Sequence, residues 1–289
     1  MKKLLTILLL VVCLVAEAQI STPLPSPNAT VSTVVGLTDV KVRYSRPKMK
    51  GRKIYGSGAD FLVPFGEIWR TGANEGTFLS FSDDVKLGGK DVKKGEYLVF
   101  TIPGAEEWTL MLYSDLDAGA LTSADYKKEK EVVRITAKPE KLTEKVETFT
   151  IGISDVAENN TSAKIQITWE NTSVKFDVGA EYEAKVMQQI YDASLAAGRY
   201  YYNSGKDLNT ALDLMNVGIQ ADPNAFWNYH VKAQIQKKLG DNAGALATAN
   251  ESLTKAKAAK NDFGYVKRNE DLIKEINAEL AKAPAKKKK

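Results

Sequence analysis

The chain has little of the side chains from which metal centres and nucleophilic triads are built. Cys13 is the only cysteine and His230 the only histidine among 289 residues. Zinc sites draw on several Cys and His ligands, and a Ser-His-Asp triad needs a histidine beside its nucleophile. His230 lies within an apolar helical pattern, which favours a structural role. Phosphate-loop and dinucleotide fingerprints are also missing, so we expect neither a metal nor a cofactor.

Long apolar runs are missing too, with one exception at the N-terminus. Two lysines precede an apolar stretch, Leu4–Val15, and Ala16-Glu17-Ala18 then supplies a small-x-small cleavage pattern, which is the order of an export signal. The apolar run is shorter than the roughly 20 residues that span a bilayer. We expect residues 1–18 to be a signal peptide cleaved before Gln19. The protein would then be exported, periplasmic or secreted, with no transmembrane segment.

Cleavage at this point would remove the one cysteine. Val12 precedes Cys13 where a lipoprotein needs a small residue, so we do not expect lipidation. The mature chain would have no disulfide and no thiolate ligand. Its 271 remaining residues are enough to bury about 75% of the unfolded surface, so its core alone can stabilise it.

The body of the chain also lacks an excess of basic charge. The whole chain carries 40 basic and 36 acidic side chains, a net charge of +4. Without residues 1–18 and the terminal Lys286–Lys289, 34 basic and 35 acidic side chains remain, a net charge of −1. A basic face for nucleic acid is therefore not expected. We expect residues 283–289 to be a disordered lysine tail.

Up to about residue 180, apolar residues alternate and turn residues recur. Segments of this kind are Val40–Tyr44, Gly95–Ile102, Trp108–Tyr113, Val132–Ala137, Val146–Ile153, Ile165–Trp169 and Val174–Val178. We expect a turn at residues 170–173, between the last two segments. Eight to ten short strands with short connections indicate an antiparallel β-sandwich or barrel over residues 19–180.

After residue 180 the apolar period becomes helical, as at Met187, Ile190, Ser194 and Leu195. An internal repeat follows, in which four positions recur 34 residues later: Ala211, Leu212, Met215 and Ile219 as Ala245, Leu246, Ala249 and Leu253. This period, with two helices per unit, resembles tetratricopeptide repeats. We expect an all-α, tetratricopeptide-like helical repeat region over residues 181–282, which makes the chain an α+β multidomain protein.

The stretch Leu62–Glu75 places polar side chains around a glycine, next to a tryptophan. Arg70 offers a planar fork to a carboxylate or sulfate. Asn74 and Glu75 complete a polar pocket, and Trp69 supplies an apolar wall or a face on which a sugar stacks. Alternatively, Arg70 and Glu75 pair with each other and fix a long loop across the end of the sheet. The sequence leaves both interpretations open.

Two more arginines are candidates for the same site. Arg46 and Arg52 could converge with Arg70 on one anion, or they could be solvated loop cations. Trp108 and Trp169 lie on predicted strands, which favours a place in the core.

Several motifs of the β half occur in the order of a known family. They are Ser26–Ser32, Tyr44–Pro47, Lys50–Gly56, Val63–Glu75, Gly95–Tyr97, Thr101–Gly104 and Glu107–Thr109. On these residues the chain, from Pro27 to about Val178, resembles the domain of unknown function 2911 of exported bacterial proteins, especially of the Bacteroidetes type. Ala118-Gly119 departs from the Trp-Gly expected there, which leaves an aromatic contact from that loop in doubt. The resemblance implies a fold and export but no activity.

Together these features favour an exported, non-catalytic binding or scaffold protein. The helical repeats would contact a protein or peptide partner, and the β half could hold a small anionic or glycan ligand. The alternative is an envelope or secreted hydrolase that acts on a glycan or peptide, with Glu75 as acid or base and Arg70 as anchor. A small-anion sensor is a third possibility. The candidate ligand-binding residues are Arg46, Arg52, Trp69, Arg70, Asn74 and Glu75.

Overall fold

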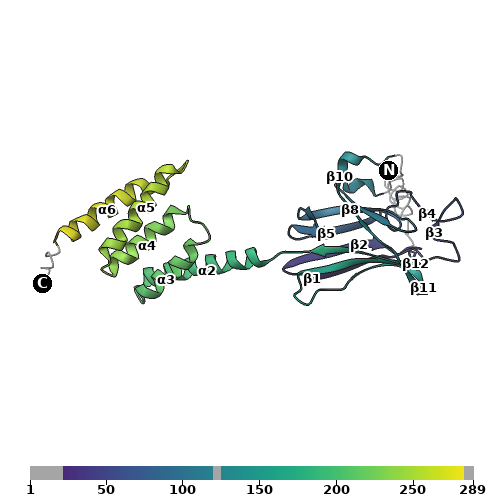
Figure 1. The fold of residues 1–289 in the computed structure, drawn as a ribbon, viewed down its shortest axis with the longest axis horizontal. Helices are drawn as coiled ribbons and strands as arrows, with labels where there is room; N and C mark the ends of the chain where they lie inside the picture. Colours follow the sequence, from purple (N-terminus) through teal and green to yellow (C-terminus); the bar gives the residue numbers. More distant parts are fainter. Residues whose placement is uncertain (1–21, 120–124, 283–289) are drawn as a thin grey trace, which may run out of the picture. The chain divides into compact units, whose positions relative to one another are not determined.

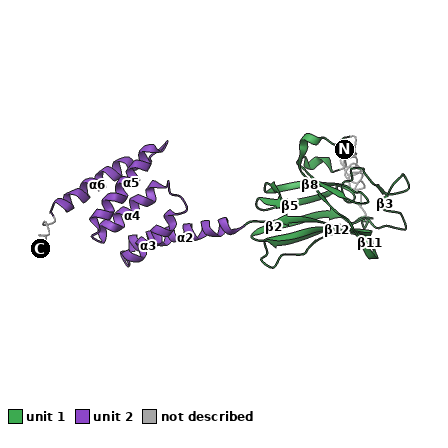
Figure 2. Cartoon of the chain, in the orientation of Figure 1, with its two compact units in different colours: residues 1–181 green, residues 182–289 purple. Residues whose placement is uncertain are grey.

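The computed structural model describes residues 22–119 and 125–282. The expected signal peptide, Cys13 and the lysine tail lie outside these residues. Strands come first along the chain and helices follow (Figure 1), so the predicted order of a β half and an α half is confirmed. The chain divides into two compact units, residues 1–181 and 182–289 (Figure 2).

Two antiparallel sheets form the first unit. The larger has the strand order β1-β2-β5-β8-β9-β10 and the smaller has the order β11-β12-β6-β7, while β3 and β4 form a separate parallel pair. In the described residues neither sheet closes on itself, so of the two predicted architectures the barrel is not formed. The strands are β1 (Asn28–Val35), β2 (Thr38–Ser45), β3 (Tyr55–Gly56), β4 (Val63–Pro64), β5 (Thr77–Phe81), β6 (Val85–Leu87), β7 (Lys90–Val92), β8 (Gly95–Ile102), β9 (Trp108–Tyr113), β10 (Glu131–Ala137), β11 (Glu140–Ser154) and β12 (Ser162–Gly179).

The main core lies between the two sheets, because apolar side chains alternate along each strand. In β2, Val40, Val42 and Tyr44 are buried and the residues between them are exposed. Ile165 and Ile167 of β12 belong to the same buried cluster. Side chains two residues apart point to one face of a sheet, so this alternation alone places these residues in the core, as the sequence predicts.

Strands β8 and β9 bury both of their faces. Val99 and Leu110 face the main core. Their neighbours belong to a second cluster, made of Phe78, Leu98, Phe100, Met111, Tyr113 and Ala118. The 3-10 turn η1 (Leu116–Ala118) brings Ala118 into this cluster; η2 (Lys128–Lys130) precedes β10. The continuous apolar runs of β8 and β9 follow from this burial on two faces.

The turn predicted at residues 170–173 is wrong, because β12 continues through it from Ser162 to Gly179. Glu170 instead adopts a left-handed backbone, with φ of 54°. It pairs with Val146 of β11, and the register between the two strands shifts on both sides of this pair. The extra residues lie on β11, where the four residues between Lys141 and Val146 face the one residue between Thr172 and Glu170 of β12, so β11 carries the β-bulges. The polar run of β12 continues the strand opposite these bulges and does not reverse the chain.

The described part of the second unit holds five helices. They are α2 (Glu183–Ser204), α3 (Leu208–Ile219), α4 (Phe226–Lys238), α5 (Asn242–Ala258) and α6 (Tyr265–Lys282). Gly205 and Gly240 follow α2 and α4 with φ of 65° and 81°, the left-handed conformation in which many helices end. Asp207 and Asp241 accept hydrogen bonds at the starts of α3 and α5, as N-caps do. The two helix pairs therefore share one turn chemistry.

Positions that repeat in the sequence are buried alike in the two helix pairs. Ala211 and Met215 of α3 are fully buried, as are Ala245 and Ala249 of α5. Small residues let the helices approach closely: a Cβ added at Gly198 in α2 would lie 3.1 Å from the sulfur of Met215. The pattern of small residues thus corresponds to close helix contacts.

His230 is buried in α4 within a polar network that joins three helices. Its Nδ1 lies 2.8 Å from Oδ1 of Asn269 in α6. The Asn269 amide donates to the Ser252 hydroxyl of α5 at 2.8 Å, and that hydroxyl donates to the Phe226 carbonyl at 2.7 Å. Burial lowers the pKa of His230, which keeps the ring neutral. Since the Asn269 oxygen can only accept, the imidazole carries its proton on Nδ1.

Candidate functional site

The segment that carries most of the candidate residues is a loop fixed against β8. Trp69 exchanges two backbone hydrogen bonds with Thr101, each of 2.8 Å. Beyond it Thr71, Gly72 and Asn74 have positive φ angles of 57°, 145° and 55°. Such a conformation is rare for a β-branched residue like Thr71. It persists only where the surrounding structure holds it in place.

Side-chain hydrogen bonds supply that support. The hydroxyl of Thr71 lies 3.0 Å from the hydroxyl of Thr101. The Asn74 amide donates to the carbonyl of Ser26 and to the hydroxyl of Ser45, both at 3.1 Å. Asn74 therefore ties the loop to the segment before β1 and to the end of β2, which uses its amide within the fold.

Trp69 lies in an aromatic cluster of the main core. Its ring centroid is 5.9 Å from Tyr55, 6.4 Å from Trp108, 5.3 Å from Phe149 and 6.1 Å from Trp169. The first three contacts are edge-to-face and the last is stacked, which are the favoured geometries of aromatic pairs. Trp69 is partly buried and packs against the main core through these rings.

Arg46 and Arg52 are bonded to backbone and hydroxyl oxygens of the fold. Arg46 donates to the carbonyl of Phe149 at 3.3 Å and to the hydroxyl of Thr150 at 3.0 Å, both in β11. Arg52 donates to two carbonyls of its own turn at 2.9 and 2.6 Å. The structure therefore does not bring these two guanidinium groups into one hydrogen-bond network with Arg70.

Arg70 and Glu75 are not paired with each other in the described residues. The Nε of Arg70 is buried, and among the described residues it has no hydrogen-bond partner. The Glu75 carboxylate instead lies 3.8 Å from the guanidinium of Arg43, and its side chain is 81% exposed. An exposed pair of this kind contributes little to stability. The interpretation in which an Arg70–Glu75 ion pair fixes the loop is therefore not supported.

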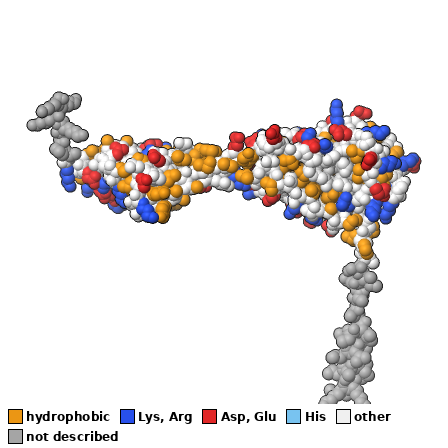
Figure 3. All heavy atoms as spheres, turned by 90° about the horizontal axis from the view of Figure 1, so that it is seen from below, with side chains coloured by type: hydrophobic (Ala, Val, Ile, Leu, Met, Phe, Trp, Pro, Cys, Tyr) orange, Lys and Arg blue, Asp and Glu red, His pale blue; other side chains and the backbone are white. Residues whose placement is uncertain are grey.

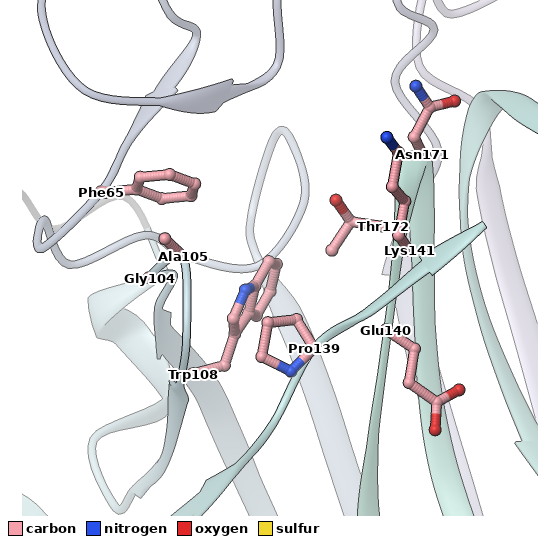
Figure 4. Close-up of a pocket in the computed structure, with 9 residues that line it drawn as sticks. All are labelled: Phe65, Gly104, Ala105, Trp108, Pro139, Glu140, Lys141, Asn171 and Thr172. Atoms are coloured by element: carbon pink, nitrogen blue, oxygen red, sulfur yellow. The ribbon is translucent and has the colours of Figure 1, made fainter.

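A separate cavity of about 260 Å³ lies at the β11 and β12 end of the first unit (Figure 4). Phe65, Trp108 and Pro139 form its apolar side, and Lys141, Asn171 and Thr172 form its polar side. Figure 4 shows the Phe65 ring facing Thr172 across the opening, with Trp108 and Pro139 beneath them. Lys141 is paired with Thr172 across the two strands.

Two unusual groups lie next to this cavity. Tyr55 is 8% exposed and its ring lies 4.9 Å from that of Trp108. Its hydroxyl is buried, without a hydrogen-bond partner in the described residues. Burial and, to a lesser extent, the charge of Glu170 raise the pKa of Tyr55 well above its usual value, so the hydroxyl keeps its proton. Glu170, the left-handed residue of β12, directly precedes the cavity residue Asn171.

Sequence reasoning missed the polar wall of this cavity. Asn171 and Thr172 were assigned to a turn, and a turn would have removed them from the sheet. Lys141 was not singled out, since it lies between the predicted strands Val132–Ala137 and Val146–Ile153, where a lysine is ordinary. A clue was present in Tyr55, which belongs to the Lys50–Gly56 motif.

The helical unit carries a groove of about 330 Å³ across α2, α4 and α6. It is lined by Tyr202, Gln234, Lys237, Lys238, Leu272, Glu275 and Glu279. The Lys237 ammonium lies 2.8 Å from Glu275 and 3.2 Å from Glu279, and the hydrogen bond to Glu275 is the main reason that the pKa of Lys237 is raised. The Lys238 ammonium lies 4.2 Å above the Tyr202 ring, a cation–π contact.

Charged side chains of both signs are mixed on the surface shown in Figure 3. In residues 22–119 and 125–282 no group of three or more His, Cys, Asp or Glu side chains is placed to hold a metal ion. Within the same residues no helix combines the length and the hydropathy needed to cross a membrane.

Comparison with known proteins gives one match. The sequence model of a family described as a protein of unknown function, DUF2911, matches residues 26–178. No curated protein and no solved structure matches the chain. The matched region contains both sheets and the cavity beside Trp108, and it ends one residue before β12 does. Since it covers more than half of the 289 residues, the chain belongs to the DUF2911 family.

Proposed function

We propose that this protein is an exported, non-catalytic binding protein whose helical unit holds an extended segment of a protein or peptide partner. The groove across α2, α4 and α6 carries this proposal. These three helices are the first members of the two helix pairs and the closing helix. A groove shared by successive units of a helical array is an extended surface that suits an extended chain.

The proposal includes a tetratricopeptide-like identity for the two helix pairs. It is supported by the 34-residue recurrence of Ala211 and Met215 as Ala245 and Ala249, all of which are buried. Fewer than three such units rarely stand alone. In this interpretation α6 closes the array, because Leu272 and Ile276 pack against Ala245 and Ala249 of the second pair.

The groove offers a peptide both polar and apolar contacts. Lys237 is already bound to two glutamates. Lys238 forms no ion pair and Gln234 no hydrogen bond within the described part of the chain. An ammonium and an amide at one rim can bind the carbonyl oxygens and acidic side chains of an extended segment. Tyr202 and Leu272 supply apolar contact area beside them.

The test is affinity capture from the envelope fraction of the native host with the full mature chain as bait. We expect the wild-type bait to capture at least one partner, and Lys238→Glu combined with Tyr202→Ala to reduce its recovery by at least about tenfold. A tenfold loss corresponds to about 1.4 kcal/mol, which is less than the loss of one hot-spot contact. The bait variants are compared by quantitative mass spectrometry.

A matched charge reversal on another face provides the control. Lys267→Glu changes a lysine of α6 that is 83% exposed and lies outside the groove, so its bait should retain the partner. Equal loss with Lys267→Glu, or no loss with the groove variant, would contradict the proposal. Circular dichroism of each bait excludes unfolding as the cause.

Export is the second part of the proposal, and it rests on the lysines, apolar run and cleavage pattern of the first 18 residues. Mass spectrometry of the protein isolated from its host should give an N-terminus at Gln19. A mature protein that retains residues 1–18, or a lipid-modified Cys13, would refute it.

The hydrolase alternative receives less support from the site. It needs Trp69, Arg70, Asn74 and Glu75 to face one substrate. Trp69 packs against the core, and the amide of Asn74 is bonded to the fold. We therefore do not adopt it.

A further inference from the structure

The cavity beside Trp108 has the features of a built ligand site, and it is independent of the helical groove. Its volume of about 260 Å³ is just below the roughly 300–1,000 Å³ of pockets that take drug-sized ligands. A single ring with a few substituents is therefore the largest ligand expected to fit.

The backbone around the cavity departs from regular sheet geometry. Glu170 is left-handed inside β12, and the register with β11 shifts on both sides of its pair with Val146. Bulges and strained residues gather beside binding sites, where they redirect side chains. Here the left-handed Glu170 directly precedes Asn171 and Thr172, and the bulged segment of β11 directly follows Lys141; these three residues line the cavity.

Trp108 offers an indole N–H to this cavity. The residue is 1% exposed, lines the cavity, and makes no side-chain hydrogen bond to any of the described residues. Its N–H is not among the buried polar atoms that lack a partner, so it is accessible to a ligand in the cavity. The Tyr55 ring packs against the Trp108 ring at 4.9 Å, and the buried Tyr55 hydroxyl has no partner in the described residues. An unpaired buried polar group reduces stability, so this hydroxyl beside the cavity calls for an explanation.

The polar wall is also available to a ligand. Lys141, Asn171 and Thr172 have no side-chain hydrogen bond or ion pair among the residues described here. Figure 4 shows the carboxylate of Glu140 turned away from the opening between Phe65 and Thr172. The charge presented to the opening is therefore the single ammonium of Lys141. Facing it are the flat apolar surfaces of Phe65 and Pro139.

We propose that this cavity binds an acidic monosaccharide, a hydroxylated ring that carries one carboxylate. The apolar face of the ring lies against Phe65 and Pro139. Its hydroxyls bond to the Asn171 amide, the Thr172 hydroxyl and the indole N–H of Trp108. Its carboxylate pairs with Lys141. An amide and a hydroxyl beside an aromatic side chain match the alternating polar and apolar surface of a sugar ring.

The test is an NMR titration of the mature chain, followed through the indole N–H signals of its four tryptophans. Each signal is assigned by replacing one tryptophan with phenylalanine. The probes are methyl glucuronide, methyl glucoside, which lacks the carboxylate, and benzoate, which lacks the hydroxyls. We expect methyl glucuronide to shift the Trp108 signal, and to bind at least about tenfold more tightly than the other two, since one charge-assisted hydrogen bond contributes this much.

Variants locate the carboxylate contact. Lys141→Met should reduce the affinity for methyl glucuronide to that for methyl glucoside and leave the latter unchanged. Lys145→Met, an exposed lysine of the same strand outside the cavity, should change neither. The proposal is overturned if benzoate binds as tightly as methyl glucuronide, if Lys141→Met has no effect, or if methyl glucuronide leaves the Trp108 signal unmoved at tens of millimolar. This test is independent of the proposed function, because failure of the helical groove to capture a partner would not change how the cavity binds methyl glucuronide.

Discussion

Replacing Trp69 with alanine is expected to lower the free energy of unfolding of the β unit by about 2–4 kcal/mol, less than the roughly 3–5 kcal/mol of fully buried tryptophan and phenylalanine truncations, because Trp69 is partly buried. The physical reason is its position among the four rings of Tyr55, Trp108, Phe149 and Trp169, all within 6.4 Å. Truncation removes its buried area and leaves a cavity in the centre of this cluster. Urea unfolding, followed by the indole NMR signal of Trp169, measures the loss.

The second unit supplies the control for this experiment. Trp227 belongs to the second unit, and among the described residues its ring contacts only that of Phe226, at 4.9 Å. Trp227→Ala should therefore leave the unfolding of the β unit unchanged. A loss below about 1 kcal/mol in Trp69→Ala would instead identify a surface residue. That result would support the alternative interpretation, in which Trp69 forms an apolar wall of a ligand pocket.

Replacing Asn269 with alanine should destabilise the helical unit by about 2–4 kcal/mol. Asn269 is fully buried and links His230 to Ser252. Its loss leaves the Nδ1–H of His230 buried without an acceptor, which costs about 1–3 kcal/mol, and a cavity adds to that. Urea unfolding followed through Trp227 measures it. Asn250→Ala is the control, because the Asn250 amide bonds only to the Leu246 carbonyl on the exposed surface of α5.

The same network gives the helical unit a pH dependence of known sign. Burial lowers the pKa of His230 in the folded state, whereas in the unfolded chain it is about 6.5. The unfolded state therefore binds more protons as the pH falls below about 6.5, and the stability falls with it until the pH reaches the lowered folded pKa. Because His230 is the only histidine, His230→Gln should abolish the change in this window. A wild-type stability that rises on mild acidification would contradict the network.

Patterns of period two and 3.6 were sufficient to predict β2, the strands from β8 to β12 and the helical region, but not β1 or the strands from β3 to β7. The sequence segments Gly95–Ile102 and Trp108–Tyr113 correspond to β8 and β9, because burial on both faces leaves an apolar run bounded by turn residues. Gly205 and Gly240 mark helix ends, because a left-handed residue there favours glycine. Both features depend on residues that are close together in the sequence, so they can be recognised from the sequence alone.

The predictions that were not confirmed concern segments whose structure depends on contacts with distant parts of the chain. Glu170-Asn171-Thr172-Ser173 has the composition of a turn, yet pairing with β11 holds it within one long strand. The composition of residues 170–173 alone does not show that β11 pairs with them. Ser26 and Ser45 satisfy the amide of Asn74, and Arg43 pairs with Glu75. The polar loop therefore resembled a ligand site because its partners, up to 48 residues away, are not visible in its own sequence.

The aromatic cluster also determines how the molecule absorbs and emits light. Trp69 lies 6.4 Å from Trp108 and 6.1 Å from Trp169, and these are three of the four tryptophans in the chain. At such separations the transition dipoles of neighbouring indoles couple, and excitation passes between them before emission. The circular dichroism of the β unit should therefore contain an exciton couplet that appears only when the two sheets are assembled. A ligand bound beside Trp108, as proposed above, is therefore expected to change the emission of the coupled rings, which would make them an optical reporter of this site.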